Sequence, residues 1–68
     1  MSKAENSKHL GDQLRAAREK VGLTQAEVAK AADIDVSYYA QIERNEVNPS
    51  IKKISAIAKV VKIKTIDV

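Results

Sequence analysis

The sequence predicts a small all-α domain built from four to five helices. A chain of 68 residues has room for one domain and no more. Its apolar residues recur at intervals of three and four along most of its length, which is the spacing of one face of a helix. Residues that favour helix starts and helix ends divide this pattern into short segments. We expect a flexible polar arm over residues 1–7 and the folded domain over residues 8–68.

The first predicted helix begins near residue 10. Its apolar residues follow at intervals of four, three and four and form one stripe: Leu10, Leu14, Ala17 and Val21. Gly22 comes directly after this stripe and can adopt the left-handed conformation that commonly ends a helix.

A second helix is predicted over residues 25–32. Thr24 and Glu27 have the spacing of a capping box, in which each side chain bonds the backbone N–H of the other residue. Leu23 and Val28 occupy the positions of a hydrophobic staple around this cap. Because a helix of about two turns is unstable alone, packing against other elements must stabilise it.

A third helix is predicted over residues 36–44. Asp35 is its expected N-cap, and Ile34 and Tyr39 again occupy staple positions. Asn45 is expected to end it, because asparagine tolerates the left-handed conformation. Two short helices joined by about three residues are the sequence signature of a helix-turn-helix.

A fourth helix is predicted after the turn at Asn48-Pro49, with Ser50 as its N-cap. Its apolar stripe contains Ile51, Ile54, Ile57, Ala58 and Val61. A fifth helix could begin within residues 63–68. The β-branched residues of 60–68 also suit a strand, but a single strand has no partner in this chain, so a helix or an irregular tail is favoured.

The composition excludes several classes of protein. The absence of cysteine and the single histidine exclude disulfides and a tetrahedral zinc site. No apolar stretch is long enough to span a membrane, and the N-terminus lacks the apolar core of a signal peptide. The sequence has no paired nucleophile and base, no glycine-rich phosphate loop and no metal cluster. We therefore expect a cytoplasmic protein that is not an enzyme, without a cofactor, a metal or a small-molecule substrate.

The charge is distributed unevenly along the chain. The net charge of +3 and the pI of about 9.3 weakly favour a polyanionic partner. The net charge is +2 over residues 1–24, −3 over residues 25–48 and +4 over residues 49–68. The predicted helix-turn-helix therefore lies in the acidic part of the chain, which counts against binding to a polyanion.

The second helix of a helix-turn-helix lies in the DNA major groove, with its first residues toward the base edges. In the predicted helix 36–44, the i, i+3 spacing places Tyr39 and Ile42 in the core. The face left outward contains Val36, Ser37, Tyr38, Gln41 and Arg44.

Four of these outward residues are candidate base contacts. Gln41 can form a bidentate pair with adenine, and Ser37 can donate to or accept from most bases. Val36 can pack on a thymine methyl group. The Tyr38 hydroxyl is expected within reach of a phosphate or a base edge.

Three motifs resemble the Cro/lambda-repressor type of helix-turn-helix family, which includes phage repressors and restriction–modification controller proteins. They are Gly-Leu-Thr-Gln at 22–25, Ile-Glu-Arg at 42–44 and Asn-Pro-Ser at 48–50. The resemblance extends over about residues 10–63. It implies a compact lambda-repressor-like DNA-binding fold and a role as a sequence-specific transcriptional regulator, with a repressor favoured over an activator.

The resemblance also implies roles for individual positions. Gln25 matches a residue that touches phosphate and supports the recognition helix, while Arg18 and Glu43 match a structural ion pair. The base-contacting positions of the family match Val36, Ser37 and Gln41. The loop that holds the DNA backbone matches Arg44, Asn45 and Asn48. Beside this loop, Lys52 and Lys53 are further candidates for phosphate contact.

The chain departs from the family at three positions where glycine is usual. Asp33 and Asn45 are mild departures, because both residue types tolerate the left-handed conformation. Lys62 is less suited to the left-handed conformation, so the chain could leave the fourth helix differently from other members of the family. Asp35 and Glu46, together with Asp33, place negative charge near the expected phosphates and should oppose binding somewhat.

The sequence therefore predicts a regulator that binds double-stranded DNA, encoded by a bacterium or a phage and associated with the nucleoid. The family implies a homodimer, for which Ile66 and Val68 are the candidate seam. A helical protein-interaction module that keeps the fold without strong DNA binding is the alternative, favoured by the acidic middle segment.

Overall fold

The computed structural model describes residues 10–62, which form four α-helices. These are α2 (Leu10–Lys20), α3 (Gln25–Ala32), α4 (Val36–Glu43) and α5 (Ile51–Val61). The predicted all-α class is confirmed. The expected arm over residues 1–7, the fifth helix over 63–68 and the dimer seam at Ile66 and Val68 lie outside the described residues.

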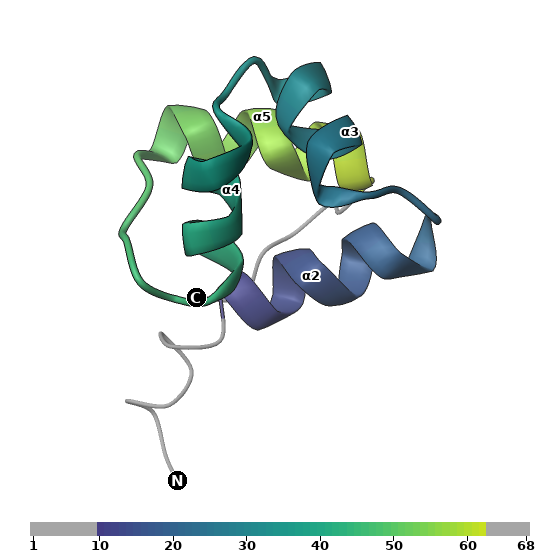
Figure 1. Ribbon diagram of the computed structural model, residues 1–68, viewed down its shortest axis with the longest axis horizontal. Helices are drawn as coiled ribbons and strands as arrows, with labels where there is room; N and C mark the ends of the chain where they lie inside the picture. The colour runs from purple at the N-terminus through teal and green to yellow at the C-terminus, as the bar shows by residue number, and fades with distance from the viewer. Residues whose placement is uncertain (1–9, 63–68) are drawn as a thin grey trace, which may run out of the picture.

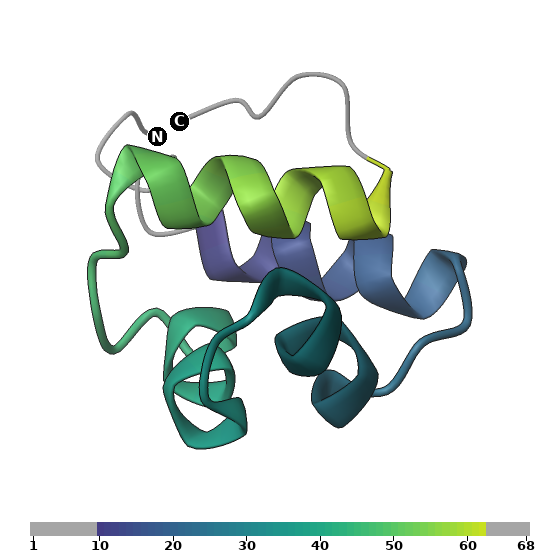
Figure 2. The same ribbon diagram turned by 90° about the horizontal axis from the view of Figure 1, so that it is seen from above.

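The four helices form two pairs that cross each other. α2 and α5 run side by side in the same direction, and α3 and α4 lie across one side of this pair (Figures 1 and 2). α3 packs on both α4 and α5, while α2 also packs on both of them. No helix within residues 10–62 is long and apolar enough to cross a membrane.

The starts of α3 and α4 are fixed by the predicted caps. The Thr24 side chain accepts a hydrogen bond from Glu27 N at 3.0 Å, and Thr24 N donates to Glu27 Oε1 at 2.8 Å. The Asp35 carboxylate accepts from the backbone N–H groups of Ser37 at 2.9 Å and Tyr38 at 3.3 Å. Each cap satisfies N–H groups that have no partner within the helix. The boundaries of both helices therefore follow from local sequence.

The helix ends all use a residue with positive φ. This conformation is found at Gly22, where φ is 77°, and at Asp33, Asn45 and Lys62, where φ is 60°, 63° and 64°. The last three are the positions where glycine was expected. Lys62 adopts the left-handed conformation despite its Cβ. The chain therefore leaves α5 with the backbone conformation that a glycine would have adopted there.

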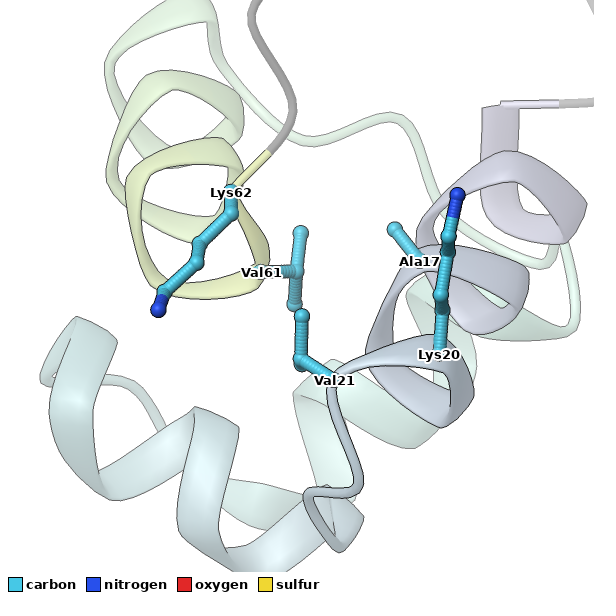
Figure 3. A pocket seen from close by; sticks show the side chains of 5 residues that line it. All are labelled: Ala17, Lys20, Val21, Val61 and Lys62. Carbon is cyan, nitrogen blue, oxygen red and sulfur yellow. The ribbon is translucent and has the colours of Figure 1, made fainter.

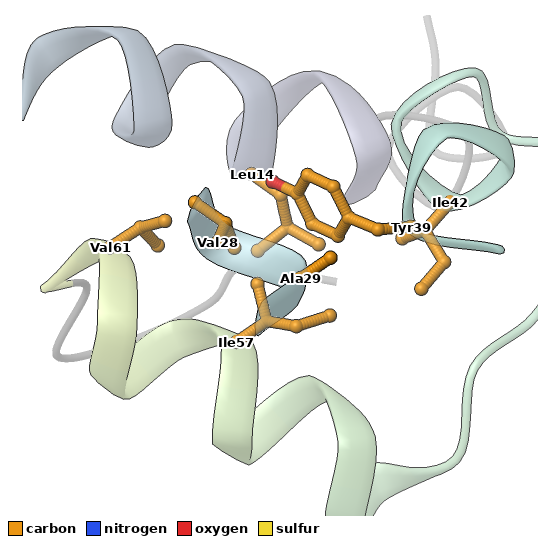
Figure 4. Close-up of a cluster of buried hydrophobic side chains, with 7 residues drawn as sticks. All are labelled: Leu14, Val28, Ala29, Tyr39, Ile42, Ile57 and Val61. Atoms are coloured by element: carbon orange, nitrogen blue, oxygen red, sulfur yellow. The ribbon is translucent and has the colours of Figure 1, made fainter. Parts of the chain in front are cut away.

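The core lies between the two helix pairs. Its buried side chains come from all four helices, as Figure 4 shows: Leu14, Val28, Ala29, Tyr39, Ile42, Ile57 and Val61. Tyr39 and Ile42 are 0% and 1% exposed, as their spacing predicted. The Tyr39 hydroxyl is buried and, among the described residues, has no hydrogen-bond partner in good geometry.

The predicted apolar stripe of α5 is buried only in part, with Ile54 and Ala58 half-buried and Ile51 outside the core. Ile51 is 78% exposed, while Ile57 and Val61 are buried. Ile51 is the first residue of α5, directly after the Ser50 side chain that caps the helix by accepting from Lys53 N at 3.2 Å. A residue in the first turn is buried only where a neighbouring element reaches that end of the helix, and none of the described elements covers Ile51.

A surface pocket of about 430 Å³ lies where α2 and α5 end. Val21 and Val61 point toward each other at its centre, and the long side chains of Lys20 and Lys62 lie on either side (Figure 3). The residues that line this pocket come from α2, α5 and the positions directly after them, and none comes from α3, α4 or the turn between them.

Candidate nucleic-acid interface

The first turn of α4 presents two of the expected base-contacting residues to solvent. Val36 is 43% exposed, and Ser37 is also exposed. Gln41, one turn further along, is half-buried. Since Tyr39 and Ile42 fill the opposite face, α4 has one face in the core and one face available to a partner.

Tyr38 is less exposed to solvent than the sequence indicated. It is half-buried and packs against the core, which its spacing from Tyr39 and Ile42 did not predict. The Lys53 ammonium lies over its ring, 5.8 Å from the centroid, at a distance typical of a cation–π contact. This contact places a lysine of α5 beside α4.

A buried ion pair joins α2 to the last turn of α4. Arg18 Nε donates to Glu43 Oε2 at 2.6 Å and Arg18 Nη2 donates to Glu43 Oε1 at 3.1 Å, so the pair is bidentate. Arg18 also donates through Nη1 to the Leu23 carbonyl at 2.9 Å, in the turn before α3. The two side chains are only 13% and 3% exposed, and one guanidinium thus fixes α2, α4 and the start of α3 together.

The environment of this pair keeps both partners charged. Burial alone would raise the pKa of Glu43, but the hydrogen bonds that it accepts from Arg18 and Gln25 lower it below its usual value. The hydrogen bond to Glu43 also raises the pKa of Arg18. The pKa of the Tyr39 hydroxyl is raised well above its usual value, first because the group is buried and second because the Glu43 carboxylate lies near it.

Gln25 extends the same network to the first residue of α3. Its Nε2 donates to Glu43 Oε1 at 2.9 Å. This contact connects the start of α3 to the end of α4 directly. The bond is made by the amide nitrogen of Gln25, and the amide oxygen of the same side chain takes no part in it.

Two residues of the loop after α4 that were expected to contact the DNA backbone have hydrogen-bond partners within the protein. Arg44 donates through Nε to Glu46 Oε2 at 2.9 Å and through Nη2 to Glu46 Oε1 at 3.0 Å. Asn45 Oδ1 accepts from Gly11 N at 2.8 Å, and Asn45 Nδ2 donates to Asp12 Oδ1 at 3.4 Å. Arg44 is thus paired and Asn45 bonds the start of α2, while Asn48 is exposed.

Gly11 is a structural residue that the sequence did not single out. A Cβ built at this position would overlap the Ile42 carbonyl oxygen and would lie 2.7 Å from the Glu43 oxygen and 2.8 Å from Asn45 Oδ1. The end of α4 therefore approaches α2 too closely for any side chain at this position. Only the glycine itself, inside an apolar stripe, could have indicated a close backbone contact.

The arrangement of α3, the short turn and α4 over a supporting α2 agrees with the comparison with known families. A family profile described as helix-turn-helix matches residues 14–68. The chain belongs to the helix-turn-helix family. It is also similar to the immunity repressor protein of Bacillus phage phi105, with 39% identity over 49 residues. That similarity covers 72% of this chain and 34% of the repressor, so the chain spans about a third of that relative's length. No solved structure matches the chain.

Two lysines lie beside the turn of this helix-turn-helix chain. Lys52 and Lys53, in the first turn of α5, line a pocket of about 260 Å³ together with Asp33 and Ile34 of the turn. The pocket therefore brings the two cations expected at phosphates next to the segment that joins α3 to α4.

The acidic residues of the helix-turn-helix segment are mostly used within the fold. Four of the five carboxylates in residues 25–48 have a partner that an N-cap or an ion pair supplies: Glu27, Asp35, Glu43 and Glu46. Asp33 is the fifth, in the left-handed position after α3. Over residues 10–62, no group of three His, Cys, Asp or Glu side chains could hold a metal ion.

Proposed function

We propose that this chain is the sequence-specific DNA-binding module of a transcriptional repressor. In this proposal α4 lies in the major groove, and Val36, Ser37 and Gln41 contact base edges, with Tyr38 at the margin of the interface. The module acts in the cytoplasm of a bacterium, at the nucleoid, and is not an enzyme.

The network around Glu43 is the observation that supports this proposal most strongly. A recognition helix specifies sequence only if its position relative to the DNA backbone is fixed. Glu43 bonds both Arg18 of α2 and Gln25 of α3, so α4 is held on two sides. The Gln25 amide oxygen remains as an acceptor, and the exposed N-terminal turn of α3 can approach a phosphate through its backbone N–H groups.

The phosphate contacts are proposed to come from both sides of α4. Gln25 and the backbone N–H groups at the start of α3 are on one side, and Lys52 and Lys53 are on the other. Asn48 and Arg44 extend the second side along the loop after α4. Contacts to phosphate set the register of the protein on the duplex, and the lysines provide most of the affinity.

The acidic residues of the helix-turn-helix segment do not favour the alternative of a protein-interaction module. That alternative depended on the negative charge of residues 25–48. Glu27 and Asp35 cap helices, and Glu43 is paired with Arg18 in the interior. These three carboxylates have roles within the fold, so the negative charge of the segment does not by itself require a protein partner.

A repressor is proposed over an activator because the similar phage phi105 protein is named an immunity repressor. We further propose a homodimer on a two-fold operator, with half-sites about 34–36 Å apart. Ile66 and Val68 stay the candidate seam. One helix-turn-helix makes few base contacts, so a second copy would add both affinity and selectivity.

Fluorescence anisotropy with labelled duplexes at a series of salt concentrations tests the proposal. We expect binding whose log K falls linearly with log salt, with a slope of about −0.9 per phosphate neutralised. Lys53→Ala should weaken binding to all duplexes alike and make the slope shallower. Absence of binding to any genomic fragment at low salt would contradict DNA binding and favour the protein-interaction module.

A further inference from the structure

Arg44 and Glu46 form a bidentate ion pair on the surface that we propose for DNA. Both oxygens of the carboxylate accept from the guanidinium, at 2.9 Å from Nε and 3.0 Å from Nη2. The two side chains are 56% and 50% exposed, so the pair lies in solvent and not in the core.

The backbone after α4 places these two side chains together. Asn45, between them, has a φ of 63°, and its N–H donates to the Ile42 carbonyl at 3.0 Å. Glu46 N donates to the Gln41 carbonyl at 2.9 Å. These two bonds are those of a Schellman motif, which reverses the chain within one residue. Residues two apart would point in different directions on a continuous helix, but this turn brings residues 44 and 46 side by side.

A carboxylate in this position offers Arg44 the same geometry as a phosphate. Both anions accept two parallel N–H bonds from the planar fork of a guanidinium. We propose that Glu46 acts as an internal competitor that occupies Arg44 in the free protein and must be displaced before Arg44 can bind a DNA phosphate. This inference rests on the proposed function and assigns Glu46 as the residue that limits the affinity of that interface.

The exposure of the pair determines the size of the effect. Exposed ion pairs are weak because both charges are hydrated and screened by salt, so a ligand with a higher charge density can release Arg44. We expect the competition to lower the affinity for DNA by about 2- to 5-fold, in line with the strength of exposed pairs. The competing explanation is that Glu46 acts only through repulsion of nearby phosphates, without the involvement of Arg44.

A double-mutant cycle separates the two explanations. Affinity for one duplex is measured at fixed low salt for the wild type, Glu46→Gln, Arg44→Gln and the double variant. Glu46→Gln should raise the affinity of the wild type, and its effect should be about 2- to 5-fold smaller when Arg44 is already replaced. Glu19→Gln is the matched control, because it changes the net charge equally but lies on α2, where Glu19 is 3.2 Å from Arg15 and, less closely, 3.8 Å from Arg18.

The outcomes distinguish this inference from the proposed function. An equal gain from Glu46→Gln in both backgrounds would overturn the competition and leave simple repulsion, while DNA binding itself would stand. Absence of DNA binding in all four proteins would overturn the proposed function and the competition with it. NMR titration of the Glu46 carboxyl group tests the pair without DNA. The hydrogen bond with Arg44 lowers the pKa of Glu46, so Arg44→Gln should raise that pKa, and an unchanged value would contradict the pair.

Discussion

The side chain of Asn45 caps the start of α2 by accepting a hydrogen bond from the backbone N–H of Gly11 at 2.8 Å. Asn45 is also the residue whose left-handed backbone ends α4. One residue thus terminates α4 and satisfies an N–H group at the start of α2 that would have no partner within that helix. This double role explains an asparagine at a position where the family usually has glycine.

Substitution by glycine should therefore have opposite effects at two left-handed positions. Lys62→Gly relieves a strained backbone and should stabilise the fold by up to about 1 kcal/mol. Asn45→Gly relieves a smaller strain but removes the hydrogen bonds to Gly11 and Asp12, so it should destabilise the fold by about 1 kcal/mol. Urea unfolding followed by circular dichroism measures both changes. Stabilisation of both variants would show that the contact of Asn45 with α2 contributes nothing.

Gly11→Ala should destabilise the domain by about 1–3 kcal/mol, because the added methyl group has no space beside the end of α4. The matched control is Ala16→Gly on the exposed side of the same helix, which should cost about 1 kcal/mol through helix propensity alone. Thermal unfolding of both variants provides the comparison. A Gly11→Ala variant as stable as the wild type would mean that α2 and α4 can move apart without cost.

The local features of the fold could be predicted from the sequence, and the contacts between distant residues could not. Thr24 and Glu27 are three residues apart, so their spacing alone indicates a cap. Gly11 and Asn45 are 34 residues apart, and no pattern within a helix indicates their contact. Ile51 has the spacing of a core residue, but the extent to which neighbouring helices cover a helix end depends on the packing of the whole domain.

The interface shows the same limit. Val36 and Ser37 are exposed because the spacing of Tyr39 and Ile42 turns the opposite face of α4 into the core. The pairing of Arg44 with Glu46 was not predicted, because residues two apart on a helix do not face each other. The pair forms since the chain has already left the helix at Asn45. The charge of a segment, counted from the sequence, therefore did not indicate which of its charges are free.

Loss of one partner of the buried pair should be more costly than loss of both. Arg18→Met leaves the Glu43 carboxylate buried without its guanidinium and should destabilise the fold by about 3–5 kcal/mol. The double variant Arg18→Met, Glu43→Leu removes both charges and should recover much of that loss. Urea unfolding of the wild type, the single variant and the double variant measures the difference. If the double variant is no more stable than the single one, the cost does not come from an unpaired buried charge.

The same pair predicts sensitivity to acid. The pKa of Glu43 is lower in the folded protein than in the unfolded chain, where it is about 4.3. The folded state therefore binds fewer protons, and the stability from Glu43 is complete above the unfolded pKa and is lost as pH falls through the folded pKa. Unfolding free energies measured from about pH 6 to about pH 3 should fall less steeply for the Arg18→Met, Glu43→Leu variant than for the wild type. Parallel curves for the two proteins would contradict this assignment.

Selection of bound sequences from a random pool of DNA duplexes tests most directly whether α4 specifies a DNA sequence. We expect enrichment of a two-fold repeated half-site by the wild type. Gln41→Ala should lose selectivity at one position of each half-site, with a loss of about 1–3 kcal/mol on the selected site. Enrichment of no sequence, or an identical preference in the Gln41→Ala variant at every position, would contradict the assignment of α4 as the recognition helix.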